Sequence, residues 1–248
     1  MIKVFSHPHT KLAACILVNK LNELGVNATL VDKINAYDNC LHIIYNASAV
    51  KALPKNYIVY QTEVPGSTWF NKRYIDIIKR AHAVWDYSVN NTKAYEHSKL
   101  CIVTPGIAPQ QIVDKEIDVL FYGCLNGCEH RKSALKLLSK SLNIKIVDNA
   151  LEGEIWHLLN KSKAVVNIHY YKNAPLEVFR INEALSFNCH VVSETSVCGD
   201  NAYEGIVCFS GVETMSEACI DVMNKPFEYN LKKLDNTKSI RLALESCV

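Results

Sequence analysis

Residues 164–194 read AVVNIHYYKNAPLEVFRINEALSFNCHVVSE. Two apolar runs rich in β-branched residues enclose a polar loop and a segment whose apolar residues recur at helical spacing. This order predicts a strand at 164–169, a helix at 175–187 and a strand at 190–193, the repeating unit of a parallel α/β sheet. Pro175 fits the first turn of that helix, where the missing N–H of proline costs nothing.

The same alternation extends along the whole chain. Short apolar runs predict strands at 2–6, 28–32, 41–45, 57–61, 83–87, 101–104, 118–123, 144–147 and 206–209. Amphipathic segments between them predict helices at 9–24, 74–81, 129–141, 154–160 and 213–223. The alternation pauses in a polar, proline-containing stretch at 105–116. We therefore predict an α/β protein with two doubly wound Rossmann-like domains, at 1–106 and 117–248, and a linker at 107–116.

Composition narrows the function. The chain has 248 residues, of which 49% are hydrophobic, and this is enough to form a sizeable core. Its formal net charge is +2. Only nine residues are glycine, and they spell neither G-x-G-x-x-G nor G-x-x-x-x-G-K-[ST]. The usual dinucleotide fingerprint and the P-loop are therefore excluded, and any phosphate must be bound by other groups.

The sequence also predicts the compartment. No apolar run approaches the roughly 20 residues of a membrane span, and the first residues indicate a strand and not a signal peptide. Ten scattered cysteines, mostly in apolar segments, favour a reducing compartment, so we expect a cytoplasmic protein. Residues 1–110 carry 12 Lys and Arg against 7 Asp and Glu, a surplus of five that is more typical of a solvated surface than of a nucleic-acid partner.

The helix predicted at 175–187 carries a pair of charged residues. Arg180 and Glu183 are three positions apart, so they share one helix face near its amino end. Arginine can form a fork of hydrogen bonds to phosphate oxygens, and a carboxylate can accept hydrogen bonds from ribose hydroxyls. The pair suits a ligand that has both groups; the alternative is an intrahelical ion pair on a solvated face.

This stretch resembles the donor-binding helix of the GT-B glycosyltransferases, and the Arg180-x-x-Glu183 spacing is similar to that of the phage DNA β-glucosyltransferases. Residues 119–135, VLFYGCLNGCEHRKSAL, fit the same families: a strand, a turn at Gly123, then an arginine that opens a helix. The resemblance implies a GT-B fold whose two domains face each other across a cleft. It implies a nucleotide-diphosphate sugar as donor and places Arg131 on the donor diphosphate.

The activity that the resemblance implies is metal-independent hexosyl or pentosyl transfer to a hydroxyl acceptor on a glycan or another macromolecule. His169 and Tyr170 follow the strand at 164–168, and open α/β sheets bind ligands at the carboxyl ends of their strands. We therefore count both among the donor-binding residues, with packing of the loop as the alternative.

A catalytic base is harder to choose. Many retaining members carry a glutamate eight positions before the second Glu of the helix, but here Pro175 stands at that position. An inverting transfer needs a carboxylate or a histidine within reach of the acceptor hydroxyl. Glu63 is our first choice because a strand ends just before it, and His7, beside His9, and Asp86 are the other candidates. Asp86 has a structural hydrogen-bonding role as its alternative.

No metal and no cofactor are expected. Cys124, Cys128 and His130 have ligand character, but no second pair follows at zinc-finger spacing, and no D-x-D motif is present. The diphosphate charge would then fall to Arg131, Arg180 and the helix dipole.

Two other functions stay open at this point. The chain could be a non-catalytic nucleotide-sugar-binding subunit that acts with a partner, or a nucleotide-sugar epimerase of similar architecture. The subunit would bind nucleotide without turnover, and the epimerase would need no acceptor.

Overall fold

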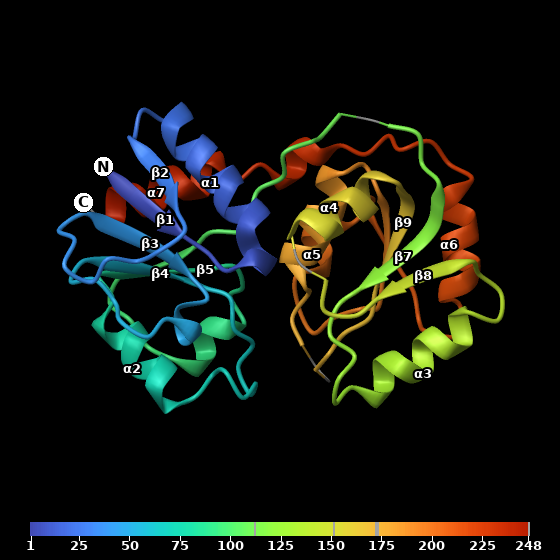
Figure 1. Ribbon diagram of the computed structural model, residues 1–248, viewed down its shortest axis with the longest axis horizontal. Coiled ribbons are helices and arrows are strands. Elements are labelled where there is room, and N and C mark those ends of the chain that lie inside the picture. The colour runs from blue at the N-terminus through green and yellow to red at the C-terminus, as the bar shows by residue number, and fades with distance from the viewer. Residues whose placement is uncertain (112, 151, 172–173, 248) are drawn as a thin grey trace. The chain divides into compact units, whose positions relative to one another are not determined.

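The computed structural model describes residues 1–111, 113–150, 152–171 and 174–247 (Figure 1). The chain forms two compact units, one made of Met1–Gly106 with residues from Asp235 onward and one made of Ile107–Leu234. Each unit holds one parallel sheet with helices, so the predicted α/β class with two doubly wound Rossmann-like units is confirmed.

The first unit contains a six-stranded sheet in the order β2-β1-β3-β4-β5-β6, in which every neighbouring pair is parallel. Its strands are β1 (Ile2–Phe5), β2 (Ala28–Val31), β3 (Leu41–Tyr45), β4 (Tyr57–Gln61), β5 (Ala83–Asp86) and β6 (Leu100–Ile102). Its helices are α1 (Lys11–Glu23), α2 (Lys72–Arg80) and α7 (Thr237–Cys247). Strand β4 is buried at every position and β3 at all but its first, because helices cover both faces of such a sheet.

The second unit contains a five-stranded parallel sheet in the order β11-β10-β9-β7-β8. Its strands are β7 (Ile117–Tyr122), β8 (Ile144–Val147), β9 (Ser162–Asn167), β10 (His190–Ser193) and β11 (Val207–Phe209). Its helices are α3 (Glu129–Leu138), α4 (Glu152–Asn160), α5 (Val178–Ser186) and α6 (Met215–Met223). Helices α3 and α6 share one hydrophobic core with β7 and β9, while α4 and α5 lie on the other side of the sheet (Figure 1).

Both sheets have the same strand order when their strands are numbered along the chain, namely 2-1-3-4-5, with a sixth strand at the end of the first sheet. The order reverses between β1 and β3 in the first unit and between β7 and β9 in the second. Connections that leave two such neighbouring strands run to opposite faces of the sheet, which opens a crevice at their carboxyl ends. These two switch points are therefore the places to look for ligands.

The carboxyl-terminal segment differs from the predicted domain range. We predicted 117–248 as one domain, but residues from 235 onward belong to the first unit, where α7 packs against β6. Ile240 and Ala243 of α7 are fully buried. The Nε2 atom of His82 lies 2.7 Å from the carbonyl oxygen of Cys247. The apolar stripe of α7 covers this part of the sheet, and no helix was predicted there.

The predicted linker at 107–116 also differs from the structure. Its residues belong to the second unit, where the Ala108 N–H donates to Ser186 Oγ at 3.1 Å and the Gln110 N–H donates to the Ser186 carbonyl at 2.7 Å. Ile112 lies outside the described residues. The first part of the stretch is therefore bound to the end of α5.

The start of α5 corrects a third prediction. The helix begins at Val178 and Glu177 is its N-cap residue, so Pro175 precedes the helix and is not in its first turn. The Leu176 N–H donates to the Cys198 carbonyl at 3.1 Å, which holds the chain outside helical geometry at this point. Among the helices of the described ranges, none is both long and apolar enough to span a membrane.

Candidate functional site: an arginine pair at the switch point of the second sheet

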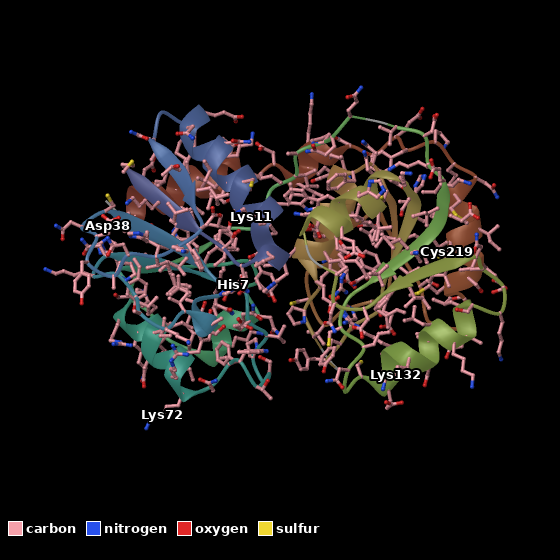
Figure 2. All side chains as sticks on the ribbon, in the orientation of Figure 1. His7, Lys11, Asp38, Lys72, Lys132 and Cys219 are labelled. Atoms are coloured by element: carbon pink, nitrogen blue, oxygen red, sulfur yellow. The ribbon has the colours of Figure 1, made fainter. Side chains whose placement is uncertain are left out.

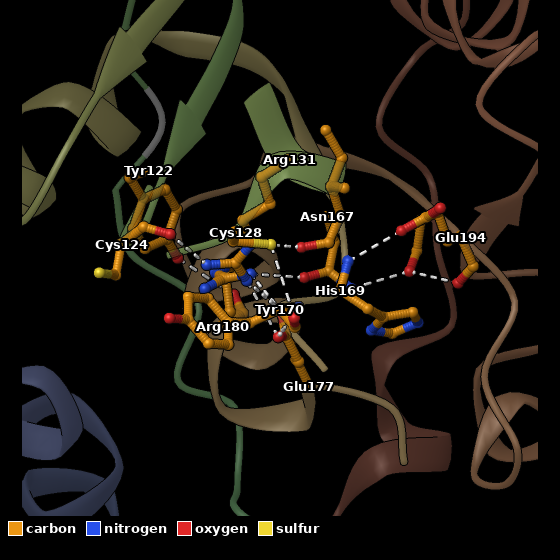
Figure 3. Close-up of polar contacts among 12 residues, drawn as sticks. Tyr122, Cys124, Cys128, Arg131, Asn167, His169, Tyr170, Glu177, Arg180 and Glu194 are labelled. Carbon is orange, nitrogen blue, oxygen red and sulfur yellow. Dashed lines mark hydrogen bonds and ion pairs between the residues drawn. The ribbon is translucent and has the colours of Figure 1, made fainter. Parts of the chain in front are cut away.

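Two arginines meet at the switch point between β7 and β9 (Figure 3). Gly123 follows the last residue of β7, and Ile168 and His169 follow the last residue of β9. Arg131 comes from the first turn of α3 and Arg180 from the first turn of α5. The fold therefore brings together four of the predicted donor-binding residues, Gly123, Arg131, His169 and Arg180.

Arg131 is 2% exposed, and hydrogen bonds fix its guanidinium on three sides. Nε donates to the Ile168 carbonyl at 2.8 Å, and one terminal nitrogen donates to the Cys124 carbonyl at 2.9 Å. The other terminal nitrogen donates to Glu177 Oε1 at 3.0 Å. The Tyr170 ring lies 5.2 Å from the guanidinium carbon and adds a cation–π contact. The orientation of this cation is therefore set before any ligand arrives.

Arg180 is held from two sides. One terminal nitrogen donates to Asn167 Oδ1 at 2.8 Å and also pairs with Glu177 Oε2. Its guanidinium carbon lies 5.6 Å from the centre of the Tyr122 ring. Since Arg180 pairs with Glu177, the alternative of an Arg180–Glu183 ion pair on a solvated face is not what the structure contains.

Glu177 joins the two arginines, and sequence analysis missed this role. Its carboxylate binds Arg131 and Arg180 and also accepts the Tyr170 N–H at 3.4 Å, whereas it makes no hydrogen bond that caps α5. Burial and the charge of Arg180 lower the pKa of Arg131 to about 10, while Glu177 opposes that shift. The one signal in the sequence was the spacing of three residues between Glu177 and Arg180.

Gly123 allows the two guanidinium groups to approach the end of β7. Its φ of +145° is rarely adopted by residues with a side chain. A Cβ atom here would lie 2.8 Å from a terminal nitrogen of Arg180 and 3.2 Å from one of Arg131. Glycine is thus required both by the backbone and by the arginine pair.

The Gly123→Ala variant should lose more than about 1 kcal/mol of unfolding free energy, because alanine is strained at positive φ. It should also displace the Arg180 side chain, which weakens binding of any anion at this place. Gly153→Ala is the matched control, since nothing lies within 4 Å of a Cβ in that α4 position and no strain is expected. Urea denaturation of both variants measures the difference; equal stabilities would contradict the prediction.

Glu183 lies one turn further along α5 and has different partners. It accepts hydrogen bonds from Trp156 Nε1 at 2.9 Å and from the Tyr122 hydroxyl at 3.0 Å. Burial raises its pKa, and these two hydrogen bonds and the charge of Arg180 oppose that shift. Tyr122 contacts both Glu183 and Arg180, so the predicted pair belongs to one hydrogen-bonded site.

The ring of His169 finds no hydrogen-bond partner among the residues that the structure describes. The residue is 8% exposed, and within the described chain both ring nitrogens are buried without a hydrogen bond. Its backbone N–H donates to Glu194 Oε2 at 2.8 Å, and Glu194 also contacts His130 Nε2 at 2.8 Å. An unpaired buried polar group costs about 1–3 kcal/mol, which favours a polar ligand here over simple loop packing.

The predicted bases lie in the first unit. Glu63 follows β4 and accepts a hydrogen bond from Ser48 Oγ at 2.6 Å. Burial raises the pKa of Glu63, and the Ser48 hydroxyl opposes that shift. His7, labelled in Figure 2, follows β1. Its ring stacks on that of His9 at 6.1 Å between centroids. Buried His7 Nε2 lacks a hydrogen-bond partner in the described part of the chain.

Asp86 does not fit the role of a base. It is 0% exposed, and its carboxylate accepts hydrogen bonds from four groups: Gln61 Nε2, the Ser88 N–H, Asn91 Nδ2 and the Tyr95 hydroxyl. An acceptor hydroxyl cannot reach a carboxylate that is fully enclosed in this way. Asp86 therefore has the structural hydrogen-bonding role that was its alternative.

The described residues contain no group of three or more His, Cys, Asp or Glu side chains that could hold a metal ion. Cys128 and His130 contact other groups instead: Cys128 Sγ donates to the Tyr170 carbonyl at 3.5 Å, and His130 contacts Glu194.

No protein-family model matches the sequence, and no curated protein matches it either. Solved structures do match its fold. AviGT4, a glycosyltransferase involved in avilamycin A biosynthesis, matches with a TM-score of 0.63 at 11% identity, over 99% of this chain and 96% of that one. An alpha-glucosyltransferase in complex with UDP-glucose and DNA matches with a TM-score of 0.61 at 11% identity, over 99% and 98% of the two chains.

A UDP-GlcNAc 2-epimerase from Methanocaldococcus jannaschii also matches, with a TM-score of 0.52 at 10% identity, over 98% of this chain and 99% of that one. The strand order and these similarities show that the chain has a GT-B glycosyltransferase-like fold, as the sequence predicted. At such low identity the similarity concerns the fold, and the chemistry has to be argued from the site.

Proposed function

We propose that the protein is a glycosyltransferase that moves a sugar from a nucleotide-diphosphate sugar to an acceptor hydroxyl. The observation that carries the proposal is the arginine pair at the switch point of the second sheet, where Arg131 and Arg180 both adjoin Gly123. Two guanidinium groups from different helices suit the two phosphates of such a donor. Glu183, on the same helix as Arg180, suits the ribose hydroxyls.

Glu177 indicates how a diphosphate would enter. Its carboxylate takes N–H groups of both arginines, and that of Tyr170, as an anion would. A diphosphate therefore competes with Glu177 for these donors. The His169 ring, just beyond β9, has no hydrogen-bond partner among the described residues and offers a further hydrogen bond to the donor.

The reaction uses the charges of the site. The acceptor oxygen forms a bond to the anomeric carbon, and the bond from that carbon to the diphosphate oxygen breaks. The electron pair leaves with the nucleoside diphosphate, whose growing negative charge Arg131 and Arg180 stabilise. Glu63 takes the proton of the acceptor hydroxyl.

The solved structures support this choice of donor. AviGT4 is a glycosyltransferase, and the alpha-glucosyltransferase structure holds UDP-glucose together with DNA. A uridine diphosphate sugar is thus the first donor to test. DNA enters the acceptor panel for the same reason, beside glycans.

The decisive experiment measures the thermal shift of the full chain with a panel of nucleoside diphosphates and nucleotide-sugars. The nucleotide-sugar that stabilises the protein most is then used in a donor-turnover assay with and without acceptors. Stabilisation by a nucleoside diphosphate and acceptor-dependent release of that nucleotide are expected. A panel in which no nucleotide raises the melting temperature would contradict the proposal.

A nucleotide-sugar epimerase is the second candidate, and the match to the UDP-GlcNAc 2-epimerase favours it. The turnover assay separates the two, because an epimerase changes the sugar of a free nucleotide-sugar in the absence of any acceptor. Nucleotide binding without turnover under every condition would instead indicate a binding subunit that needs a partner.

The proposed base predicts a pH dependence. Burial raises the pKa of Glu63, and a general base must be ionised to accept a proton. The transfer rate should therefore rise with pH through a midpoint above the usual glutamate value of about 4.3. In Glu63→Gln the rate should fall strongly above this midpoint and lose its rise with pH, whereas Glu96→Gln, an exposed control, should keep the profile. A profile unchanged by Glu63→Gln would rule out this base.

A further inference from the structure

The first unit contains a hollow that the proposed reaction does not use. It has a volume of about 340 Å³ and lies between α2 and the segment that leads from β3 to β4. Four cationic side chains line it, Lys51, Lys55, Arg73 and Arg80, and no carboxylate of the described chain does. Buried apolar residues complete the wall, among them Val50 and Ile77.

The positive charges of this hollow are not neutralised by neighbours. In the described ranges no carboxylate lies within ion-pair distance of any of the four cations. Asp76 lies on the same helix but does not line the hollow. Arg80 lies in the last turn of α2, where the helix dipole favours a cation, but Arg73 lies in the first turn, where the dipole disfavours one. The helix alone therefore does not account for the cluster.

The two arginines are held in place by backbone carbonyls. The terminal nitrogens of Arg73 donate to the carbonyls of Ser48 and Val50 at 2.8 and 2.5 Å. Arg80 Nε donates to the Asp76 carbonyl at 3.1 Å. These bonds orient the guanidinium groups without reducing their charge, which suits recognition of phosphate oxygens.

Ser48 connects this hollow to the candidate base. Its carbonyl accepts from Arg73, and its hydroxyl donates to Glu63. Ser48 and Glu63 do not line the hollow themselves, but Ser48 links Arg73 of the hollow to the group that would take the acceptor proton.

We propose that the hollow binds a phosphate group, and, on the basis of the proposed function, that this phosphate belongs to the acceptor. Lys51, Lys55, Arg73 and Arg80 bind the phosphate oxygens. Val50 and Ile77 contact the organic part of the molecule. The acceptor class is then a phosphorylated hydroxyl compound, anchored by its phosphate in the hollow, which Ser48 links to Glu63.

Calorimetric titration of the full chain with inorganic pyrophosphate tests the site at a salt concentration of about 0.15 M. The Lys51→Glu/Lys55→Glu variant should bind pyrophosphate at this site at least about tenfold more weakly, because two cations that face the anion are replaced by carboxylates. Lys72→Glu/Lys79→Glu is the matched control, since both lysines are exposed on α2 and neither lines the hollow. Lys72 is labelled in Figure 2. Arg80→Gln removes one cation without reversing its charge and should also weaken binding.

Arg180→Ala separates this site from the proposed donor site. It should keep the pyrophosphate binding that Lys51→Glu/Lys55→Glu loses, and it should lose nucleotide binding. If Lys51→Glu/Lys55→Glu, measured in the Arg180→Ala background so that the arginine pair does not contribute, binds pyrophosphate as tightly as Arg180→Ala alone, the phosphate site is overturned whatever the nucleotide data show. If Arg180→Ala keeps nucleotide binding, the proposed function fails while the hollow can still bind phosphate.

A hexose phosphate tests the source of the phosphate. Binding in the hollow about tenfold tighter than that of inorganic phosphate supports an organic acceptor, because the apolar wall then contributes. Equal affinities would overturn the assignment to an acceptor and leave a site for inorganic phosphate.

Discussion

Replacement of Arg180 by alanine should lower nucleotide-sugar turnover by about 100-fold or more, the usual loss when a donor to the developing negative charge is removed. Arg180 touches Asn167, Glu177 and Tyr122, and it is the arginine of the pair with the greater exposure, 17% against 2%. The protein should therefore stay folded, because Glu177 keeps its contact with Arg131. Steady-state kinetics with the best donor of the nucleotide panel measure the effect.

Two further variants make the result specific. Arg180→Lys keeps the charge but loses the planar fork, so it should recover only part of the turnover. Lys132→Ala removes an exposed cation next to Arg131 that pairs with Glu129, and it should leave turnover unchanged. Full activity of Arg180→Ala in a folded protein would remove the arginine pair from the proposed mechanism.

Replacement of Glu177 by alanine should cost about 3–5 kcal/mol of unfolding free energy, as when one partner of a buried ion pair is removed. Arg131 is 2% exposed, so it cannot turn to water when its carboxylate is lost. Arg180 would also remain beside it, with a like charge. Urea denaturation followed by circular dichroism measures the loss.

The control for this variant is Glu129→Ala. Glu129 also pairs with a cation of α3, Lys132, but both side chains are exposed, so the loss should stay below about 1 kcal/mol. Glu177→Gln keeps the shape and one acceptor and should lie between the two. A loss for Glu177→Ala as small as that for Glu129→Ala would show that Arg131 does not depend on this carboxylate.

Local patterns predicted much of this protein. Every expected strand is present, because short runs rich in apolar and β-branched residues between turn signals can be recognised in the chain itself. The Arg180-x-x-Glu183 spacing was also sufficient to place both residues on α5, since helical geometry fixes neighbours three apart.

Contacts between distant segments could not be predicted in this way. The carboxylate of Glu177 reaches Arg131, 46 residues earlier in the chain, only because β7 and β9 are neighbours in the sheet. Asp86 was a candidate base until the structure placed four donors around it. One face of helix α7 is apolar, but this pattern does not predict which of the two sheets the helix packs against.

The sequence by itself thus determined the α/β alternation and the residue types of the site, because these depend on spacing within single elements. Only the tertiary structure shows that the Glu177 carboxylate pairs with both Arg131 and Arg180. The same holds for the burial of Asp86 and for the place of Arg73 in the wall of the basic hollow. Burial and charge pairing arise between elements far apart in the chain, and only the folded arrangement of strands sets those distances.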